Sequence, residues 1–159
     1  MTNKKPSRAA QRALAEQPMM NSTMVGRWQA WAPRMQSVLR IMAAFLFIQY
    51  GTAKLFALPG ALLPNGATVH VASLIWLAAV LEMFGGLLLL VGLFTRPVAF
   101  LLSGEMAFAY FTNHAKAGFW PVLNQGTPAV LFCFIWLYIS SAGPGPWSLD
   151  AWTKRTEAP

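Results

Sequence analysis

Apolar residues gather in four long stretches along the chain, separated by short polar segments or segments rich in Pro and Gly. About 20 residues cross a hydrocarbon core of roughly 30 Å, and backbone inside lipid must satisfy its own hydrogen bonds, which favours helices. The pattern predicts an all-α polytopic membrane protein, a bundle of four transmembrane helices with short loops. Because the last two stretches have 16 residues each, we expect bilayer thinning, flanking aromatics or burial to compensate. The expected helices lie at about residues 37–58, 69–93, 97–112 and 127–142.

The segments outside these helices are polar and basic. Residues 1–36 carry six Lys and Arg residues against one acid, which predicts a basic cytoplasmic tail. Within it, residues 24–36 combine Trp and Arg, as is typical of the membrane–water interface. This part has two interpretations, a segment lying on the inner leaflet or an unstructured juxtamembrane linker. Residues 37–152 are expected to form the membrane domain, and residues 153–159 a second cytoplasmic tail.

Composition and charge support the membrane interpretation. Of the 159 residues, 56% are hydrophobic and 11% are charged, whereas a soluble domain carries about a quarter charged residues. The net charge of +7 comes mostly from the N-terminal tail, so the bases form no stripe of the kind that binds nucleic acid. With the N-terminus inside, ten Lys and Arg residues fall on the inner side and two on the outer side. This asymmetry predicts that both termini are cytoplasmic.

Few residues are candidates for metal binding or thiol chemistry. Cys133 is the single cysteine, which excludes an internal disulfide or a Cys-rich metal site, and we interpret it as a packing residue. His70 and His114 are the two histidines, both near the expected outer surface. We therefore expect no metal site, and no motif for flavin, iron–sulfur or haem is present.

Two acidic residues lie where lipid surrounds the chain. Glu82 is near the middle of the second expected helix, and Glu105 is near the middle of the third. A charge at the bilayer centre costs at least about 2.5–3.5 kcal/mol, so such residues are functional candidates. The tight inner turn that contains Arg96, which we assign a structural role, makes these helices antiparallel neighbours. The two carboxyl groups could then face one another, with one protonated or a proton shared.

Further polar residues could extend this pair into a seam that opens outward. Lys54 can reach back toward the glutamates, and Tyr50, four residues earlier, shares its helix face. His114 and Asn124 would stand at the mouth. In one interpretation, Lys54 pairs with a glutamate simply to hold the bundle together. In the other, the seam binds a small ligand with a polar head, the carboxylates and Lys54 moving protons or donating hydrogen bonds.

Adjacent glycines in the second stretch have a structural explanation. Gly85 and Gly86 have no side chain beyond a hydrogen atom, and they lie within a segment of otherwise bulky, apolar residues. Small residues let membrane helices approach closely. We expect a helix–helix contact at this position.

In the order of its motifs, the sequence resembles the DoxX family of small four-helix membrane proteins over residues 40–152. The family often has an acidic residue after the Asn-x-Gly turn, where this chain has Thr127. The resemblance implies a multi-pass protein of the bacterial cytoplasmic (inner) membrane. It rests on Gly51-Thr-Ala-Lys-Leu-Phe56, Glu82-Met-Phe-Gly-Gly-Leu-Leu-Leu-Leu-Val-Gly-Leu-Phe-Thr-Arg-Pro97, Glu105-Met-Ala-Phe-Ala-Tyr-Phe111, His114, Gly118-Phe-Trp-Pro121, Asn124-Gln-Gly126 and Gly143-Pro-Gly-Pro-Trp-Ser-Leu-Asp150.

By this resemblance, the first functional hypothesis is a quinone-linked subunit of a membrane oxidoreductase system. The family is named after a subunit associated with membrane sulfur oxidation that passes electrons to quinone. Glu82 and Glu105 would handle protons, Lys54 would bond a carbonyl oxygen, and His114 would gate or relay from outside. With no cofactor motif, quinone would carry the electrons or a redox partner protein would supply them.

Two other functions remain open at this point. The chain could be a non-catalytic scaffold or assembly factor that holds a partner protein in the bilayer. It could also be a small-solute transporter, which four helices would form only as a homo-oligomer. Whether the chain is itself an enzyme is left open by the sequence.

Overall fold

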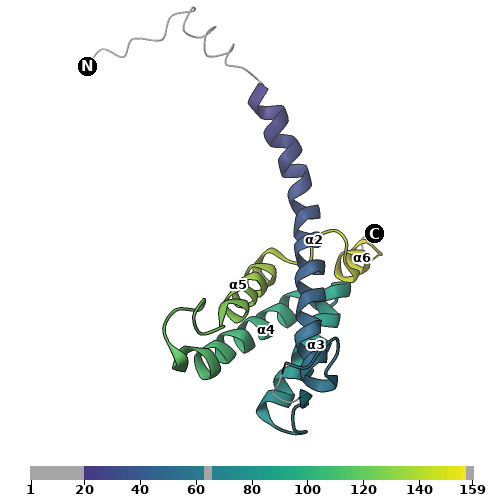
Figure 1. Ribbon diagram of the computed structural model, residues 1–159. Helices are drawn as coiled ribbons and strands as arrows, with labels where there is room; N and C mark the ends of the chain where they lie inside the picture. The colour runs from purple at the N-terminus through teal and green to yellow at the C-terminus, as the bar shows by residue number, and fades with distance from the viewer. Residues whose placement is uncertain (1–19, 63–65, 157–159) are drawn as a thin grey trace, which may run out of the picture. The chain divides into compact units, whose positions relative to one another are not determined.

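The computed structural model describes residues 20–62 and 66–156, with side chains described from residue 26 onward. Within these ranges the chain is all-α, as the sequence predicts, and contains no strand. Figure 1 shows the order of the helices along the chain. They are α2 (Met20–Phe56), α3 (Leu74–Val91), α4 (Thr95–Ala109), the π-helix η2 (Tyr110–His114), the 3-10 helix η3 (Ala115–Ala117), α5 (Thr127–Ala142) and α6 (Leu149–Thr156).

The chain divides into two units, residues 1–33 and residues 34–159. In the first unit, residues 20–33 are helical and the side chains of residues 26–33 are exposed. The expected tail up to residue 19 and the last three residues, 157–159, lie outside the described residues. The expectation that the first helix begins at residue 37 is wrong, because α2 already begins at Met20. Hydropathy locates apolar runs, whereas the Ala, Met, Gln and Arg residues that lie before residue 37 also have good helix propensities.

Two helices of the described chain are long and apolar enough to cross a membrane, and they are Gly26–Phe56 and Leu74–Val91. The helix α5 is apolar but has only 16 residues. The 15 residues of α4 run directly into the five residues of η2. The third helical segment therefore extends further at both ends than the expected range of 97–112.

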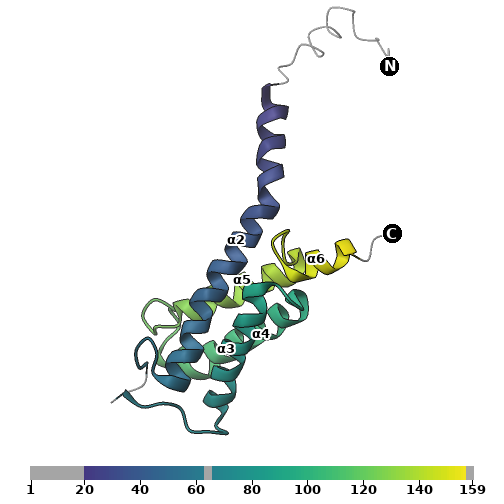
Figure 2. The ribbon, with the colours of Figure 1, turned by 90° about the vertical axis from the view of Figure 1, so that its right-hand side faces the viewer.

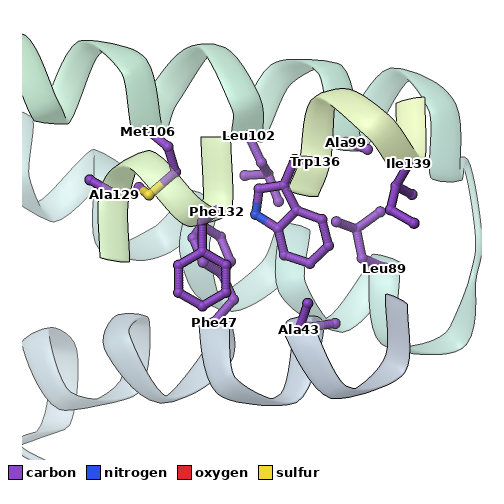
Figure 3. Close-up of a cluster of buried hydrophobic side chains, with 11 residues drawn as sticks. Ala43, Phe47, Leu89, Ala99, Leu102, Met106, Ala129, Phe132, Trp136 and Ile139 are labelled. Carbon is purple, nitrogen blue, oxygen red and sulfur yellow. The ribbon is translucent and has the colours of Figure 1, made fainter. Parts of the chain in front are cut away.

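The core of the second unit is an aromatic cluster between α2 and α5, covered by α3 and α4 (Figure 3). Trp136 on α5 is fully buried. Its ring centroid lies 5.5 Å from that of Phe47 on α2 and 6.0 Å from that of Phe132. Edge-to-face and offset ring pairs of this kind add about 0.5–1.5 kcal/mol each beyond the burial of area. Leu89 and Leu102 bring α3 and α4 onto the same cluster.

Glycines let α2 and α3 touch at the level of the backbone. A Cβ on Gly51 would lie 2.7 Å from the carbonyl oxygen of Ala79, and one on Gly86 would lie 2.7 Å from Cγ1 of Ile48. Real Cβ atoms do not approach so closely, so these positions must be glycine for the two helices to cross at this distance. The expected close contact at Gly86 is thus made with α2.

One buried arginine ties three parts of the chain together at the C-terminal end of α3. Arg40 is 0% exposed. Its Nη1 donates to the carbonyl oxygens of Leu89 and Leu90, Nε donates to that of Pro144 at 2.9 Å, and Nη2 donates to that of Trp147. The last carbonyls of a helix lack partners within the helix, and a cation is favourable there. Arg40 therefore caps α3 and binds the segment that follows α5.

The same end of the bundle holds a carboxylate cap. Asp150, at the start of α6, accepts hydrogen bonds from the backbone N–H groups of Phe94 and Thr95, each at 2.9 Å. Its own N–H donates to the carbonyl oxygen of Gly92 at 2.9 Å. An acidic side chain at a helix N-terminus satisfies free N–H groups and opposes the positive end of the helix dipole. Figure 2 shows α6 following the segment that leaves α5.

Arg96 completes this set of caps. Its Nη1 donates to the carbonyl oxygens of Ser140 at 3.0 Å and Ser141 at 2.5 Å, at the C-terminal end of α5. The helices α4 and α5 lie side by side (Figure 1), so the first turn of α4 brings Arg96 to the last turn of α5. The structural role expected for Arg96 is therefore that of a cap on a neighbouring helix.

Candidate functional site

An ion pair joins α2 to α3 within the apolar part of the chain. Nζ of Lys54 lies 2.5 Å from Oε1 of Glu82. The Glu82 side chain is only 3% exposed, whereas that of Lys54 is 22% exposed. The close crossing at Gly51, one turn before Lys54, brings the last turn of α2 within reach of α3. The pairing expected from the cost of an isolated charge is thus made with Glu82.

Glu105 lies on α4 with both of its carboxyl oxygens buried. Neither oxygen has a hydrogen-bond partner in the described chain, and the same holds for Oε2 of Glu82. A buried polar atom without a partner costs about 1–3 kcal/mol, and more when it is charged. Three such oxygens on two neighbouring helices mark this place as one where a bound group could complete the hydrogen bonding.

Both glutamates and Lys54 line one cavity of about 570 Å³ between α3 and α4. This volume lies within the range of small-molecule sites, which are mostly apolar with a few convergent polar groups. Most of the lining side chains are apolar, and the charged ones are the two glutamates, Lys54 and Lys116. The lining consists of Lys54, Leu74, Ile75, Leu77, Ala78, Leu81, Glu82, Phe100, Leu101, Gly104, Glu105, Phe108, Ala109, Thr112, Asn113 and Lys116.

The rim of this cavity is apolar and exposed. Phe100 on α4 is 67% exposed, and Leu74, Leu77 and Phe108 are exposed as well. The cavity therefore opens sideways between the helices, through a surface that suits hydrocarbon better than water. A ligand with a polar head and an apolar body could place its head beside the charged side chains and its body against the apolar rim.

Tyr50 lies away from the glutamates. It lines a second cavity of about 740 Å³ between α2 and α5, and its ring packs against Phe132 with centroids 5.9 Å apart. The four-residue spacing places Tyr50 and Lys54 on neighbouring parts of the helix surface, yet the two side chains line different cavities. Ligand binding by Tyr50 stays a prediction.

His114 and Asn124 organise the loop that precedes α5. Nδ1 of His114 lies 3.0 Å from the carbonyl oxygen of Asn124. The Asn124 side chain donates to the carbonyl oxygen of Gly118 at 2.8 Å and accepts from the N–H of Gly126 at 2.8 Å. Neither residue is among those that line the cavity of the glutamates. The predicted seam is thus divided among three places, and the ligand-binding roles of these two residues stay predictions.

Lys116 is a lining residue that the sequence reasoning passed over. Lys116 is one of the two bases expected on the outer side, and it shares the cavity with Glu105. The two are eleven residues apart, which is close to three helical turns. This spacing places both on one face, and it is the signal that could have identified Lys116.

Comparison with known proteins identifies the family of the chain. The sequence model of the DoxX family matches residues 35–115, which include Lys54, Glu82 and Glu105. An uncharacterized protein from Haemophilus influenzae is 38% identical over 125 residues, which cover 77% of this chain and 92% of that relative. No solved structure matches. The chain belongs to the DoxX family of membrane proteins.

Proposed function

We propose that this DoxX family member binds a quinone-like molecule between α3 and α4, as a subunit of a membrane oxidoreductase system. The observation that carries the proposal is the group of three buried, unpartnered carboxyl oxygens beside Lys54, in a cavity with apolar walls. A quinone has carbonyl oxygens that accept hydrogen bonds and an apolar ring and tail. The carbonyl oxygens can accept hydrogen bonds from the Lys54 ammonium and from a protonated carboxyl group, and the ring and tail match the apolar rim of this cavity.

The proposal places four helices across the bacterial cytoplasmic membrane, with both termini in the cytoplasm. Besides the two long apolar helices, α4 continues into η2 for 15 and five residues, which together approach the length that a span needs. For α5, with 16 residues, packing against α4 and the aromatic loop before it would compensate for the short length. The ten inner and two outer bases support the orientation.

The charge balance of the cavity supports a role in handling protons. Lys54 is bonded to one oxygen of Glu82, so its single positive charge offsets one carboxylate. Glu105 has no such partner among the described residues, and an uncompensated buried charge is costly. A proton on Glu105 removes this cost, and the carboxylic acid can then donate a hydrogen bond to a carbonyl oxygen.

The residues would divide the work as follows. Lys54 and protonated Glu105 would hold the two sides of the polar head, and Glu82 would fix the position of the Lys54 ammonium. Bound quinone would supply the capacity to accept electrons, which the chain itself lacks by motif. A partner protein would deliver those electrons.

Lipid extraction of the purified protein tests the proposal. We expect protein isolated in a mild detergent to retain quinone in near-stoichiometric amount and the Glu105→Leu variant to lose it, because Leu keeps the volume but removes the donor. Tyr50→Phe, in the other cavity, is the matched control and should retain quinone. Wild-type protein that carries a stoichiometric partner but no quinone would contradict the proposal and favour the scaffold hypothesis.

A further inference from the structure

The cavity between α3 and α4 has polar groups at one end only, and this asymmetry has a consequence for proton movement. We propose that Glu82 and Glu105 exchange protons with water at the η2–η3 end of the cavity, and that the opposite end, toward the turn between α3 and α4, is closed. The inference deepens the proposed function and rests on it for its biological meaning. The water path itself can be measured without a ligand.

Glu105 is about equally far from the two ends of its helical segment. Thr95 lies ten residues before it and Lys116 eleven residues after it, or about 15 and 16.5 Å at 1.5 Å per residue. Length alone therefore favours neither end as the source of protons. The positions of the lining residues along α3 and α4 distinguish the two ends.

The lining residues all lie on the η2–η3 side of a sharp boundary. No lining residue of α4 precedes Phe100, and none of α3 follows Glu82. Beyond Glu105, the lining continues through Thr112 and Asn113 to Lys116. On α3 the cavity thus extends from Glu82 toward the η2–η3 end only, and on α4 it reaches no more than five residues back from Glu105, to the apolar Phe100, but eleven residues forward, to Lys116.

A packed layer closes the other direction. One turn beyond Glu82, a Cβ on Gly85 would lie 3.0 Å from Cδ1 of Leu102, so α3 and α4 are in close contact there. Leu102 and Leu89 are fully buried. Such close-packed apolar groups leave no room for a chain of water molecules.

The open end coincides with the π-helix η2, at Tyr110–His114. In a π-helix each backbone hydrogen bond spans five residues instead of the four of an α-helix, and such turns are frequent at functional sites. Four, seven and eleven residues after Glu105, on both sides of and within this π-helix, the chain still faces the cavity. These positions, Ala109, Thr112 and Lys116, line the cavity, and so does the neighbouring Asn113.

The charged groups that face the cavity come from four elements. They are Lys54 of α2, Glu82 of α3, Glu105 of α4 and Lys116 of η3. Lys116 is exposed, unlike the other three. Its ammonium stands where water would enter, so it should attract anions to this entrance and repel cations.

Thiol labelling tests the path directly. Cys133 is the sole cysteine, so Cys133→Ala gives a background without thiols. Into it we would place Gly104→Cys, because a Cβ on Gly104 meets nothing within 4 Å and the residue lines the cavity next to Glu105. Lys116→Cys in the same background identifies the side of the entrance. The control is Phe134→Cys, exposed on α5 but outside the cavity.

Membrane vesicles of both orientations are treated with the impermeant anionic reagent MTSES, which reacts with the hydrated thiolate. We expect Gly104→Cys to react from the same side as Lys116→Cys, and at least about ten-fold faster than Phe134→Cys, whose thiol stays in lipid. Adding Lys116→Glu should slow MTSES and speed the cationic reagent MTSET at Gly104→Cys.

Reaction of Gly104→Cys from the opposite side, from both sides alike, or no faster than Phe134→Cys would overturn the inference. If Gly104→Cys does not fold, Ala109→Cys, one turn nearer the entrance, serves in its place with the same expected result. The vesicles are reconstituted from protein and lipids that have been extracted free of quinone, so the outcome is independent of whether the cavity binds quinone. A failure here is thus distinguishable from a failure of the proposed function.

Discussion

At the scale of single residues, the chemistry of the cavity depends on the Lys54 ammonium, which can pair with only one of the two buried carboxyl groups. Lys54 bonds to Glu82 at 2.5 Å, and Glu105 is left without a partner among the described residues. The sequence could predict that a charge in an apolar helix would be paired, because that rule depends only on residue type. It could not tell which glutamate would be paired, or that Tyr50 would line another cavity, because both depend on the rotation of α2 about its axis.

The ion pair leads to a prediction about stability. Lys54→Met should lower the free energy of unfolding by up to about 3 kcal/mol, because it leaves the Glu82 carboxylate buried without its partner. Lys54→Met combined with Glu82→Gln should recover a large part of that loss, since no charge is then left uncompensated. The measurement is chemical unfolding in detergent micelles. A double variant as unstable as the sum of the two single variants would contradict the pairing.

At the scale of helices, hydropathy predicts the positions of the apolar segments more accurately than it predicts where each helix begins and ends. The expected range 127–142 coincides with α5, where Pro128 and Gly143 mark both ends in the sequence. The range that was expected to end at residue 112 instead continues as a π-helix to His114, which no hydropathy pattern encodes. Arg40 is one of the ten bases expected on the inner side, but in the structure it caps α3. Sequence could not predict this cap, because long-range hydrogen bonds leave no periodic signal.

The crossing of α2 and α3 leads to a prediction with a matched control. Gly51→Ala should destabilise the protein and loosen the Lys54–Glu82 pair, because its Cβ would lie 2.7 Å from backbone atoms of α3. Gly104→Ala, where a Cβ meets nothing within 4 Å, should be neutral or stabilising by up to about 1 kcal/mol through helix propensity. Thermal unfolding of both variants in one detergent checks this. Equal effects of the two substitutions would rule out the close crossing.

The cap made by Arg40 leads to a second prediction at this scale. Arg40→Lys should be strongly destabilising although it preserves the charge, because an ammonium lacks the planar fork that reaches four carbonyl groups on two segments. Lys154→Gln, an exposed position on α6, is the control and should change little. Limited proteolysis of the segment between α5 and α6 reports the loss of anchoring. Unchanged cleavage in Arg40→Lys would show that the guanidinium bonds are dispensable.

At the scale of the whole molecule, the chain is a DoxX family membrane protein with two helices that are long and apolar enough to span a bilayer. The class of fold could be predicted because composition and the four apolar stretches are properties of the sequence itself. The cavity could not be predicted, because it depends on where α3 and α4 separate on the η2–η3 side of the contact between Gly85 and Leu102. Charge counts predict the orientation but leave it to be measured.

Topology mapping tests that orientation. Reporter fusions at residues 65 and 120 should show the outer side, and a fusion at residue 159 should show the inner side, because ten bases are expected inside and two outside. Paired reporters that are active on opposite sides control for expression. An outer location for residue 159 would exclude four spans.

The most direct test of the central claim is photoaffinity labelling with a quinone that carries a photoreactive group on its ring, followed by peptide mapping. The two cavities offer distinct destinations, one between α3 and α4 and one between α2 and α5. We predict saturable labelling of α4 around Phe100–Phe108, competed by unlabelled quinone and lost in Glu105→Leu but kept in Tyr50→Phe. Saturable labelling confined to α2 and α5, or labelling that Glu105→Leu leaves unchanged, would contradict the account.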